Sequence, residues 1–398
     1  MNRTAAVPRL VLGAIVALLA QWPVAAEDPP TAWIESTGHR VVRLSREGGS
    51  ASLYFHQNQY TAGGDKMIIA TREGLSTIDL ETHAIEPLVA GRASHVVVGR
   101  KTRQVFYVRG DTVFVTHLDT RATRAIVANP QLRSGSGLTV NADETLLAGS
   151  YVEGGGESAT LPANTTAAVA GQPPTGSSLE ARWAARRPMA LYTIDIRTGS
   201  VNVFYKSTDW LNHVQFSPTD PTLVMYCHEG PWHKVDRIWT IRTDGSNRRL
   251  MHERKMEMEI AGHEFFSQDG RTIWYDLQTP KSTEFWLAGV EIASGVRVRY
   301  KVAREHWSVH FNASPDGKLF AGDGGGPRSV AAPGNGQWIY LFTPNNGALD
   351  AERLVDLTKH DYQLEPNVSF TPDGRWIVFR SNMHGASHVY AVEVAKAR

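Results

Sequence analysis

One strand–turn–strand pattern recurs through the second half of the chain and limits the folds that the chain can adopt. Each copy has a short β-type run, a turn containing Asp with Pro or Gly, and a second run rich in β-branched and aromatic residues. The turn aspartates are 49, 47 and 57 residues apart, a spacing typical of β-propeller blades. The four copies are HVQFSPTDPTLVMY (213–226), HEFFSQDGRTIWYD (263–276), HFNASPDGKLFAGD (310–323) and NVSFTPDGRWIVFR (367–380).

Weaker copies of the pattern precede these four, at 51–84, 93–120 and 138–200. Seven copies predict an all-β fold, a seven-bladed β-propeller with four-stranded antiparallel blades of about 53 residues each. The last copy ends near the C-terminus without a fourth strand. We therefore expect residues 39–45 to supply that strand and close the ring, which leaves no open sheet edge. A row of independent β-domains is the alternative, and the even period argues against it.

The N-terminal segment has the pattern of a cleaved secretory signal. Two arginines precede an apolar run from Leu10 to Ala20, and small residues follow before a Pro-rich stretch. The run is too short for a stable membrane span. The sequence therefore predicts a signal peptide at 1–26, one propeller domain at 27–398, and a periplasmic or secreted protein.

Residues 153–188 interrupt the third copy of the pattern. The first part of this stretch is low in complexity and rich in Gly, Ala, Thr and Pro, which predicts a loop. The run from Ser178 to Arg186 is typical of a short capped helix. We expect an insertion loop and a short helix within this range.

The composition excludes several classes of function. With 41 basic and 40 acidic residues the net charge is +1, so no basic surface for nucleic acid is expected, and no membrane partner. Cys227 is the single cysteine, which excludes an internal disulfide and a cysteine-based zinc cluster, and we expect it to pack as a small buried residue. GxSxG, HExxH and P-loop motifs are absent. No pattern indicates an oligomeric state.

Polar residues recur four positions before the Ser or Thr of each turn, on what should be the innermost strands. Equivalent positions in successive blades share one mouth of the central channel, so these side chains should form a ring. A single inward histidine usually only fills such a channel, but three in register with an asparagine indicate a site. The ring residues are His213 (Ser217), His263 (Ser267), His310 (Ser314) and Asn367 (Thr371).

Two further segments should reach the same mouth. The loop CHEGPWHKVDR (227–237) brings His228, Glu229 and Arg237, and the stretch before the last inner strand brings Gln363 and Glu365. For the last two residues, structural and ligand roles are equally open. Together with the ring, these His, Glu, Gln and Asn side chains suit Mn²⁺ or another divalent transition metal. They do not form a pure oxygen cage.

At this level of detail the chain resembles the oligogalacturonate lyase family over about residues 40–398. The motifs that carry the resemblance are CHEGPWHKVDRIW, GHEFFSQDGRTIWYD, SVHFNASPDGKLFAGDG and LEPNVSFTPDGRWIVFRSNMHGASHVYAVEV. The resemblance implies a seven-bladed propeller that cleaves short pectic uronides by β-elimination with Mn²⁺. In such a reaction a base removes the C5 proton of the sugar, while positive groups neutralise the adjacent carboxylate.

The resemblance also implies roles for individual residues. His263 matches the general base, Arg237 the arginine that stabilises the substrate carboxylate, and His310 a metal-ligand histidine. Glu365 and Asn367 stand where the family has two histidines, so this chain departs from the pattern. Gln363 lies one position out of register with the family glutamine, and export is a further departure. The predicted metal ligands are therefore His310, Glu365, Asn367 and Gln363, and the predicted substrate-binding residues are His213, His228 and Glu229.

The sequence thus favours an exported polysaccharide lyase that acts on oligogalacturonides or related short uronides with Mn²⁺ or another divalent metal. The main alternative is a non-catalytic periplasmic propeller that binds a sugar or a protein through the same mouth. A hydrolase with paired carboxylates would have to use Glu229 and Glu365, and it ranks last.

Overall fold

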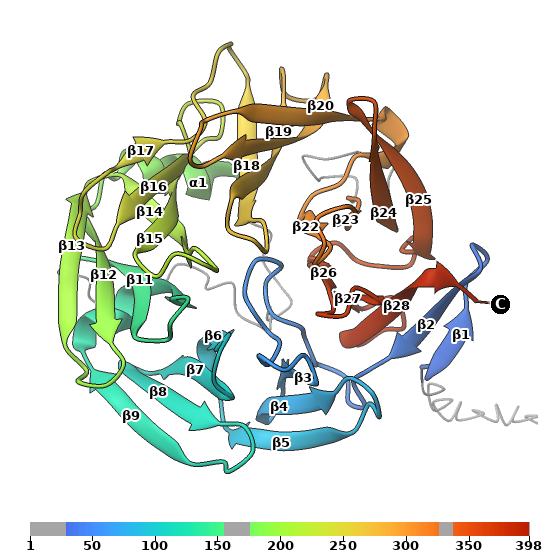
Figure 1. Cartoon of the computed structure of the whole chain (residues 1–398), viewed down its shortest axis with the longest axis horizontal. Coiled ribbons are helices and arrows are strands. Elements are labelled where there is room, and N and C mark those ends of the chain that lie inside the picture. The colour runs from blue at the N-terminus through green and yellow to red at the C-terminus, as the bar shows by residue number, and fades with distance from the viewer. Residues whose placement is uncertain (1–28, 155–175, 326–336, 398) are drawn as a thin grey trace, which may run out of the picture. The chain divides into compact units, whose positions relative to one another are not determined.

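Antiparallel β-strands are the main regular structure in the residues that the structure, a computed structural model, describes: 29–154, 176–325 and 337–397. Residues 31–398 cluster as one unit, and residues 1–30 form another. Within the larger unit, successive sheets surround a common axis, and each has an edge strand nearest that axis (Figure 1). This is the arrangement of a β-propeller.

The N-terminal half of this unit contributes three sheets of consecutive antiparallel strands, of three, four and four strands. They are β3 (Lys66–Thr71), β4 (Gly74–Asp79) and β5 (Ile85–Ala90); β6 (Ser94–Val98), β7 (Gln104–Arg109), β8 (Thr112–His117) and β9 (Thr123–Ala128); and β10 (Gly135–Val140), β11 (Leu146–Val152), β12 (Met189–Asp195) and β13 (Val201–Ser207). A 3₁₀ turn, η1 (Pro130–Ser134), precedes β10.

The next part of the unit forms a four-stranded sheet and an eight-stranded sheet. The eight-stranded sheet consists of two antiparallel halves, which are joined at their outer strands through one parallel pair, Lys301 with Ala348. The strands are β14 (Trp210–Phe216), β15 (Leu223–Glu229), β16 (Ile238–Arg242) and β17 (Arg249–Leu250); β18 (Ile260–Phe266), β19 (Thr272–Gln278), β20 (Phe285–Glu291) and β21 (Arg297–Val302); and β22 (Asn312–Ala313), β23 (Phe320–Gly322), β24 (Trp338–Asn345) and β25 (Ala348–Asp356). A short 3₁₀ turn, η3 (Arg304–His306), follows β21.

The last sheet closes the ring with strands from both ends of the unit. Strands β26 (Ser369–Phe370), β27 (Trp376–Ser381) and β28 (His388–Lys396) are completed by β2 (His39–Arg43), which pairs antiparallel with β28, and by β1 (Ala32–Ile34) outside it. The prediction that residues 39–45 supply the missing strand is confirmed. Val41 of β2 is fully buried in the same cluster as Ile377 and Val392, so closure also buries apolar surface.

The core lies between neighbouring sheets rather than within one layer. Strands such as β3 and β15 are buried at nearly every position, because each face of their sheets packs against a neighbouring sheet of the ring. One cluster joins Ile68 and Leu75 of the first sheet to Val98 and Tyr107 of the second. Cys227 is fully buried, as predicted.

The first sheet departs from the predicted pattern. The sequence predicts two strands within residues 51–71, but the structure forms only β3 there, together with isolated bridges at Ala51 and Tyr60. Between these bridges two backbone N–H groups donate to side chains instead of to β3. The N–H of Leu53 donates to Gln59 Oε1 at 3.0 Å, and the N–H of Phe55 donates to Asn367 Oδ1 at 3.2 Å. Residues 54–56, named the central segment below, therefore leave the sheet.

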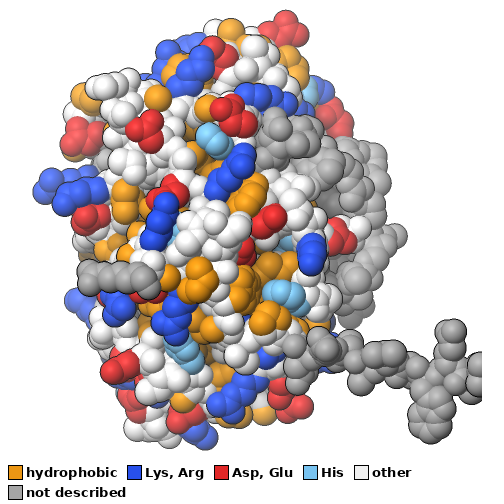
Figure 2. Space-filling model, turned by 90° about the vertical axis from the view of Figure 1, so that its right-hand side faces the viewer, with side chains coloured by type: hydrophobic (Ala, Val, Ile, Leu, Met, Phe, Trp, Pro, Cys, Tyr) orange, Lys and Arg blue, Asp and Glu red, His pale blue; other side chains and the backbone are white. Residues whose placement is uncertain are grey.

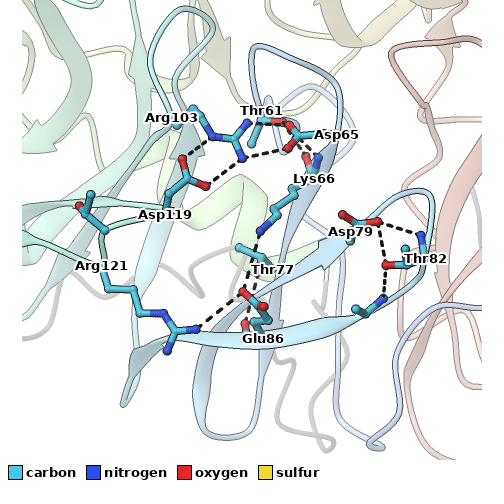
Figure 3. A network of polar contacts seen from close by, with 12 residues as sticks. Thr61, Asp65, Lys66, Thr77, Asp79, Thr82, Glu86, Arg103, Asp119 and Arg121 are labelled. Atoms are coloured by element: carbon cyan, nitrogen blue, oxygen red, sulfur yellow. Dashed lines mark hydrogen bonds and ion pairs between the residues drawn. The ribbon is translucent and has the colours of Figure 1, made fainter.

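An ion-pair network on the surface joins the first two sheets (Figure 3). Arg103, in the turn between β6 and β7, donates to both carboxylate oxygens of Asp65 at 2.7 and 2.9 Å and to those of Asp119 at 2.6 and 3.1 Å. These bonds hold the pKa of the Asp65 carboxyl well below its usual range despite some burial. Because the side chains are 29–45% exposed, the network contributes only about 1 kcal/mol.

Three sequence predictions concern the N-terminal segment and the insertion, which the structure describes only in part. The signal peptide at 1–26 and most of the insertion loop, residues 155–175, lie outside the described residues. The helix α1 (Gly176–Ala184) lies within the predicted insertion. No helix in the described part of the chain is long and apolar enough to cross a membrane. On the face shown in Figure 2, basic and acidic side chains are interspersed, in keeping with the balanced composition.

Val41→Ala tests the closing strand. Val41 is fully buried, whereas Ile34 on the outermost strand is 55% exposed. We expect Val41→Ala to lower the free energy of unfolding by about 2 kcal/mol, and Ile34→Ala to lower it by less than about 0.5 kcal/mol. Urea unfolding followed by tryptophan fluorescence measures both. Equal losses in the two variants would show that β2 does not hold the ring closed.

Candidate functional site

The ring residues share an unusual backbone conformation. His213, His263, His310 and Asn367 have φ angles of 47°, 49°, 48° and 54°, in the left-handed region that few side chains adopt. In β14 and β18 the residue lies at a β-bulge, where the pairing register with the next strand shifts. A bulge of this kind redirects one side chain out of the regular alternation of the strand.

Two weaker copies of the pattern have the same geometry. His95 in β6 has φ 52° and Gly137 in β10 has φ 69°, and both lie at register shifts. Each also stands four residues before its turn residue, Gly99 or Asn141. Sequence reasoning missed these two positions, although the spacing that identifies them is the same.

The ring side chains from different sheets meet near the axis. The rings of His263 and His310 have centroids 4.5 Å apart, which brings the predicted base and the predicted metal ligand into contact. The central segment packs against them. Between ring centroids, Phe55 lies 5.2 Å from His310 and 6.2 Å from His263. The ring centroid of Tyr54 lies 5.7 Å from that of His310 and 5.8 Å from that of His213. The predicted convergence of these inner strands is therefore present.

Each of the two contacting histidines has its own buried carboxylate. His263 Nδ1 lies 3.0 Å from Asp276 Oδ1, and His310 Nδ1 lies 2.8 Å from Asp323 Oδ2. Both aspartates are almost fully buried, and each follows its histidine by 13 residues, at the end of the next strand. A carboxylate at Nδ1 fixes the ring and favours the tautomer with its proton on Nδ1, so Nε2 keeps its lone pair.

The open nitrogen of His310 faces a second carboxylate. His310 Nε2 is buried without a hydrogen-bond partner among the described residues, and Glu365 Oε2 lies 3.8 Å from it. Burial opposes protonation of His310, but the charges of Asp323 and Glu365 raise its pKa to about 9. Desolvation by the surrounding protein opposes ionisation of Glu365, although its side chain is 48% exposed, and the charges of His310 and Arg380 hold the pKa of Glu365 below its usual value.

These two donors fit a divalent cation. A separation of 3.8 Å is too long for a hydrogen bond, so the imidazole nitrogen and the carboxylate oxygen are not bonded to each other and would both be available to a divalent cation. Asn367 and Gln363 are placed less favourably. Asn367 Oδ1 accepts the N–H of Phe55, and its Nδ2 donates to the backbone oxygen of Glu365 at 3.1 Å.

Gln363 is exposed, and the contact found for it is a backbone one, from its N–H to Asp361 Oδ1 at 3.0 Å. The described residues contain no group of three or more His, Cys, Asp and Glu side chains that could hold a metal by themselves. Further ligands would have to come from Asn, Gln, water or substrate.

The predicted arginine is held by its neighbours on the other side of the ring. Arg237 is 2% exposed. Its Nη1 donates to Glu229 Oε1, and its Nη2 lies 3.4 Å from Glu229 Oε2 and 4.0 Å from Glu264 Oε2. The guanidinium lies 4.4 Å from the centre of the Trp232 ring. Arg237 Nε is buried without a partner among the described residues, and the bonds to Glu229 use only two of the five guanidinium N–H groups.

Trp232 connects the arginine with the predicted base. Its ring lies 5.1 Å from that of His263, edge to face, so it separates the imidazole from the guanidinium by one side chain. Gly262 makes room for it, because a Cβ at that position would lie 2.6 Å from the Trp232 ring. The sequence analysis did not identify Trp232, although it stands in the same loop motif as Glu229 and Arg237.

The predicted substrate-binding residues are divided by the structure. His213 Nε2 lies 3.6 Å from Glu229 Oε2, so these two residues lie together beside Arg237. His228 projects from the opposite face of β15, since neighbouring side chains alternate along a strand, and its Nε2 lies 3.4 Å from Asp209 Oδ1. Burial lowers the pKa of His213 and of His228, so both favour the neutral form.

Arg380 is a further positive group that sequence reasoning missed. It follows Asn367 by 13 residues, the same offset that separates each of the two histidines from its aspartate. Its Nε donates to the backbone oxygen of Glu365 at 2.7 Å, and its Nη1 donates to that of Ser52 at 3.3 Å. The side chain thus ties Ser52, just before the central segment, to the stretch before the last inner strand and places a positive charge beside Glu365.

The chain matches a family model described as oligogalacturonate lyase over residues 179–397. It is 31% identical over 216 residues to the oligogalacturonate lyase of Dickeya dadantii (strain 3937), and the match covers 51% of this chain and 55% of that protein. The chain therefore spans about half the length of the curated relatives it matches.

Solved structures resemble the chain over a longer range. An oligogalacturonate lyase from Vibrio parahaemolyticus has a TM-score of 0.76 and 23% identity, covering 92% of this chain and 96% of that one. A structure titled as oligogalacturonate lyase in complex with manganese has a TM-score of 0.77 and 24% identity, with the same coverage. At these identities the likeness establishes a shared fold.

Glu229→Gln tests the buried ion pair. Burial opposes ionisation of Glu229, but Arg237 outweighs it and lowers the pKa of Glu229 from 4.5 to about 2. A depressed folded-state pKa stabilises the fold above pH 4.5, and this stabilisation is lost as pH falls toward 2. We expect the wild-type free energy of unfolding to fall across this window by on the order of 3 kcal/mol more than that of the variant.

Urea unfolding at a series of pH values measures this difference. The control is Glu86→Gln, which removes a carboxylate that is 56% exposed at the surface. If the acid dependence of Glu229→Gln parallels that of the wild type and of the control, Glu229 does not act as the buried partner of Arg237.

Proposed function

Because the chain belongs to the oligogalacturonate lyase family, we propose that it is a polysaccharide lyase that cleaves oligogalacturonides or related short uronides by β-elimination. The observation that carries the proposal is the pair of contacting histidines, His263 and His310, each bonded through Nδ1 to a buried aspartate. One histidine can accept a proton while the other holds a cation, on the same side of the central segment.

His263 is the general base in this proposal. Elimination begins with removal of the C5 proton, which lies α to the sugar carboxylate, and proton transfer to a positioned base of this type contributes about 10²–10⁴-fold to the rate. Asp276 bonds to Nδ1 at 3.0 Å, so Nε2 is the nitrogen that receives the proton. Asp276 also stabilises the imidazolium that forms. Trp232 packs against the ring and fixes its orientation.

Arg237 supplies a positive charge for the substrate carboxylate. While that carboxylate is negative, the adjacent C–H is a poor acid, so a neighbouring cation lowers the barrier. Glu229 and Trp232 hold the guanidinium in place, and the guanidinium keeps N–H groups that are not bonded to Glu229. In this proposal His213 and Glu229 bind substrate beside it, whereas His228 lies on the opposite face of β15 beside Asp209 and has no substrate contact to offer there.

His310 and Glu365 hold the metal, for which Mn²⁺ is proposed. The manganese complex of an oligogalacturonate lyase with the same fold supports this choice, as does the unpartnered Nε2 of His310 opposite a carboxylate. When bound, Mn²⁺ supplies positive charge that neutralises the substrate carboxylate and stabilises the developing enediolate. Asp323 orients the His310 ring. Asn367 and Gln363 remain predicted ligands that would have to turn toward the cation.

Two further features belong to the proposal. We count the halves of the eight-stranded sheet as two blades, which gives a seven-bladed propeller. We also propose that residues 1–26 are a cleaved signal and that the protein acts in the periplasm or outside the cell, a proposal supported by the sequence pattern of that segment.

A binding function without catalysis is the second candidate. It is favoured by the occupation of Asn367 Oδ1 by the Phe55 N–H and by the engagement of Arg237 with Glu229. Both contacts use groups that a lyase would direct at metal or substrate. A protein that binds uronides or Mn²⁺ but forms no unsaturated product would support this second function.

Product formation tests the lyase function. Elimination creates a conjugated double bond in the product, so we expect ultraviolet absorbance to grow when the protein acts on di- and trigalacturonate with Mn²⁺. His263→Ala should lower kcat by about 10³-fold. Asp276→Asn should lower it by about tenfold or more, because the His263 ring loses the carboxylate that fixes its orientation and tautomer. His306→Ala, outside the site, is the control. The lyase proposal fails if the folded wild type forms no such product from any uronide tested.

Metal retention tests the second half of the site. After loading with Mn²⁺ and dialysis, we expect the wild type to keep the metal, as measured by elemental analysis and electron paramagnetic resonance. His310→Ala should weaken binding by about 100-fold and Glu365→Gln by about tenfold. His384→Ala removes an imidazole elsewhere and should retain wild-type affinity. Retention of Mn²⁺ by His310→Ala would place the metal elsewhere.

A further inference from the structure

A cavity lies at the other end of the inner strands from the candidate functional site, among the turns that follow these strands. Its volume is about 280 Å³, and its lining includes Phe55, His56 and the turn residues Pro218, Pro315 and Pro372. This space is named the turn-side cavity. Nothing in the proposed lyase chemistry uses it.

The central segment separates the turn-side cavity from the candidate catalytic site. Phe55 and His56 line the cavity, and the same two rings pack against the ring histidines, Phe55 against His263 and His310 and His56 against His213. The backbone oxygen of Phe55 accepts from Asn312 Nδ2 at 3.3 Å, which holds the segment across the axis. The cavity opens instead at a rim where residues such as Gln268 and Pro372 are exposed.

Arg100 is the only Asp, Glu, Lys or Arg among the described residues that line this cavity. No ion pair found in the described part of the chain involves it, and burial, with no neighbouring acid, lowers its pKa. Glu144, the acid next to this turn, is occupied by the backbone of Lys101 and by the backbone and hydroxyl of Thr102. A partly buried guanidinium without an acid is a favourable place for an anion, because the anion would restore the charge balance.

The remaining lining suits a ligand that carries hydroxyl groups. Gln57 Oε1 accepts the N–H of Tyr54, which leaves its amide N–H₂ as a donor. Gln215 Nε2 donates to the backbone oxygen of Glu264, which leaves its oxygen as an acceptor. Phe216 and Phe266 add aromatic surface. Amides pair with hydroxyls, and aromatic rings cover the C–H face of a small ring.

We propose that the turn-side cavity is a second ligand site, which binds a small hydroxylated carboxylate, a sugar acid of about one ring, with Arg100 pairing with its carboxylate. The planar guanidinium of arginine can hold a carboxylate through two parallel hydrogen bonds. The volume of about 280 Å³ lies at the lower limit of small-molecule sites, which limits the ligand to this size.

Titration calorimetry on the full chain tests this site, with galacturonate as the probe and with chelator present to remove metal from the other site. Galactose has the same ring shape without the carboxylate and should bind at least about tenfold more weakly. Arg100→Gln should weaken galacturonate binding by about tenfold or more, and Arg100→Lys by less, because it keeps the charge but loses the fork.

Lys101→Gln is the matched control, since it removes one positive charge from the adjacent exposed residue. This variant should bind galacturonate within about twofold of the wild type. Circular dichroism melting checks that each variant is folded. Equal affinities in Arg100→Gln and Lys101→Gln would overturn the proposal, as would the absence of binding to the wild type. Binding that is lost in His263→Ala but kept in Arg100→Gln would also overturn it, because it would assign the ligand to the catalytic mouth.

Discussion

A left-handed residue on each inner strand is the constraint on which the site depends. An L-residue with positive φ costs about 1–2 kcal/mol, and the surrounding sheets must hold it in place. Histidine and asparagine enter this region more readily than most residues, and glycine enters it freely. The residues found there are histidine at four positions, asparagine at 367 and glycine at 137. Backbone geometry thus limits which residue types can stand on the ring, before any chemistry selects among them.

The central segment is the second element that makes the site. The central segment leaves the first sheet and lies near the axis. Its rings, those of Tyr54, Phe55 and His56, contact the ring histidines. Burial and the charges of Glu365 and Glu264 raise the pKa of Tyr54 far above its usual value, so its hydroxyl stays protonated among these carboxylates. The central segment, which does not form an inner strand of the first sheet, therefore forms one side of the site.

The sequence predicts the sheets and the ring because both follow from a repeat with fixed spacing. His263 and His310 were identified by their offset from the turn, and closure by the missing last strand. Asp276 and Asp323 were missed, although they end the same repeat segments, because a bulge shifts the register and only coordinates show which later residue then faces the ring. The central segment carries no repeat signal, and the engagement of Arg237 with Glu229 depends on how a loop folds back.

The charge balance around His310 favours the cation that we propose there. Asp323 and Glu365 contribute two negative charges near the ring and Arg380 one positive charge, and the two carboxylates raise the pKa of His310 to about 9 despite its burial. A divalent cation would replace the proton on His310 and balance the same carboxylates, and a carboxylate ligand in place of an imidazole would shift the preference toward harder ions such as Mn²⁺. Asn367 then has a different task, because its Oδ1 holds the Phe55 N–H. Asn367 thus supports the central segment in this structure, and it would have to turn before it could serve as the metal ligand that the sequence predicts.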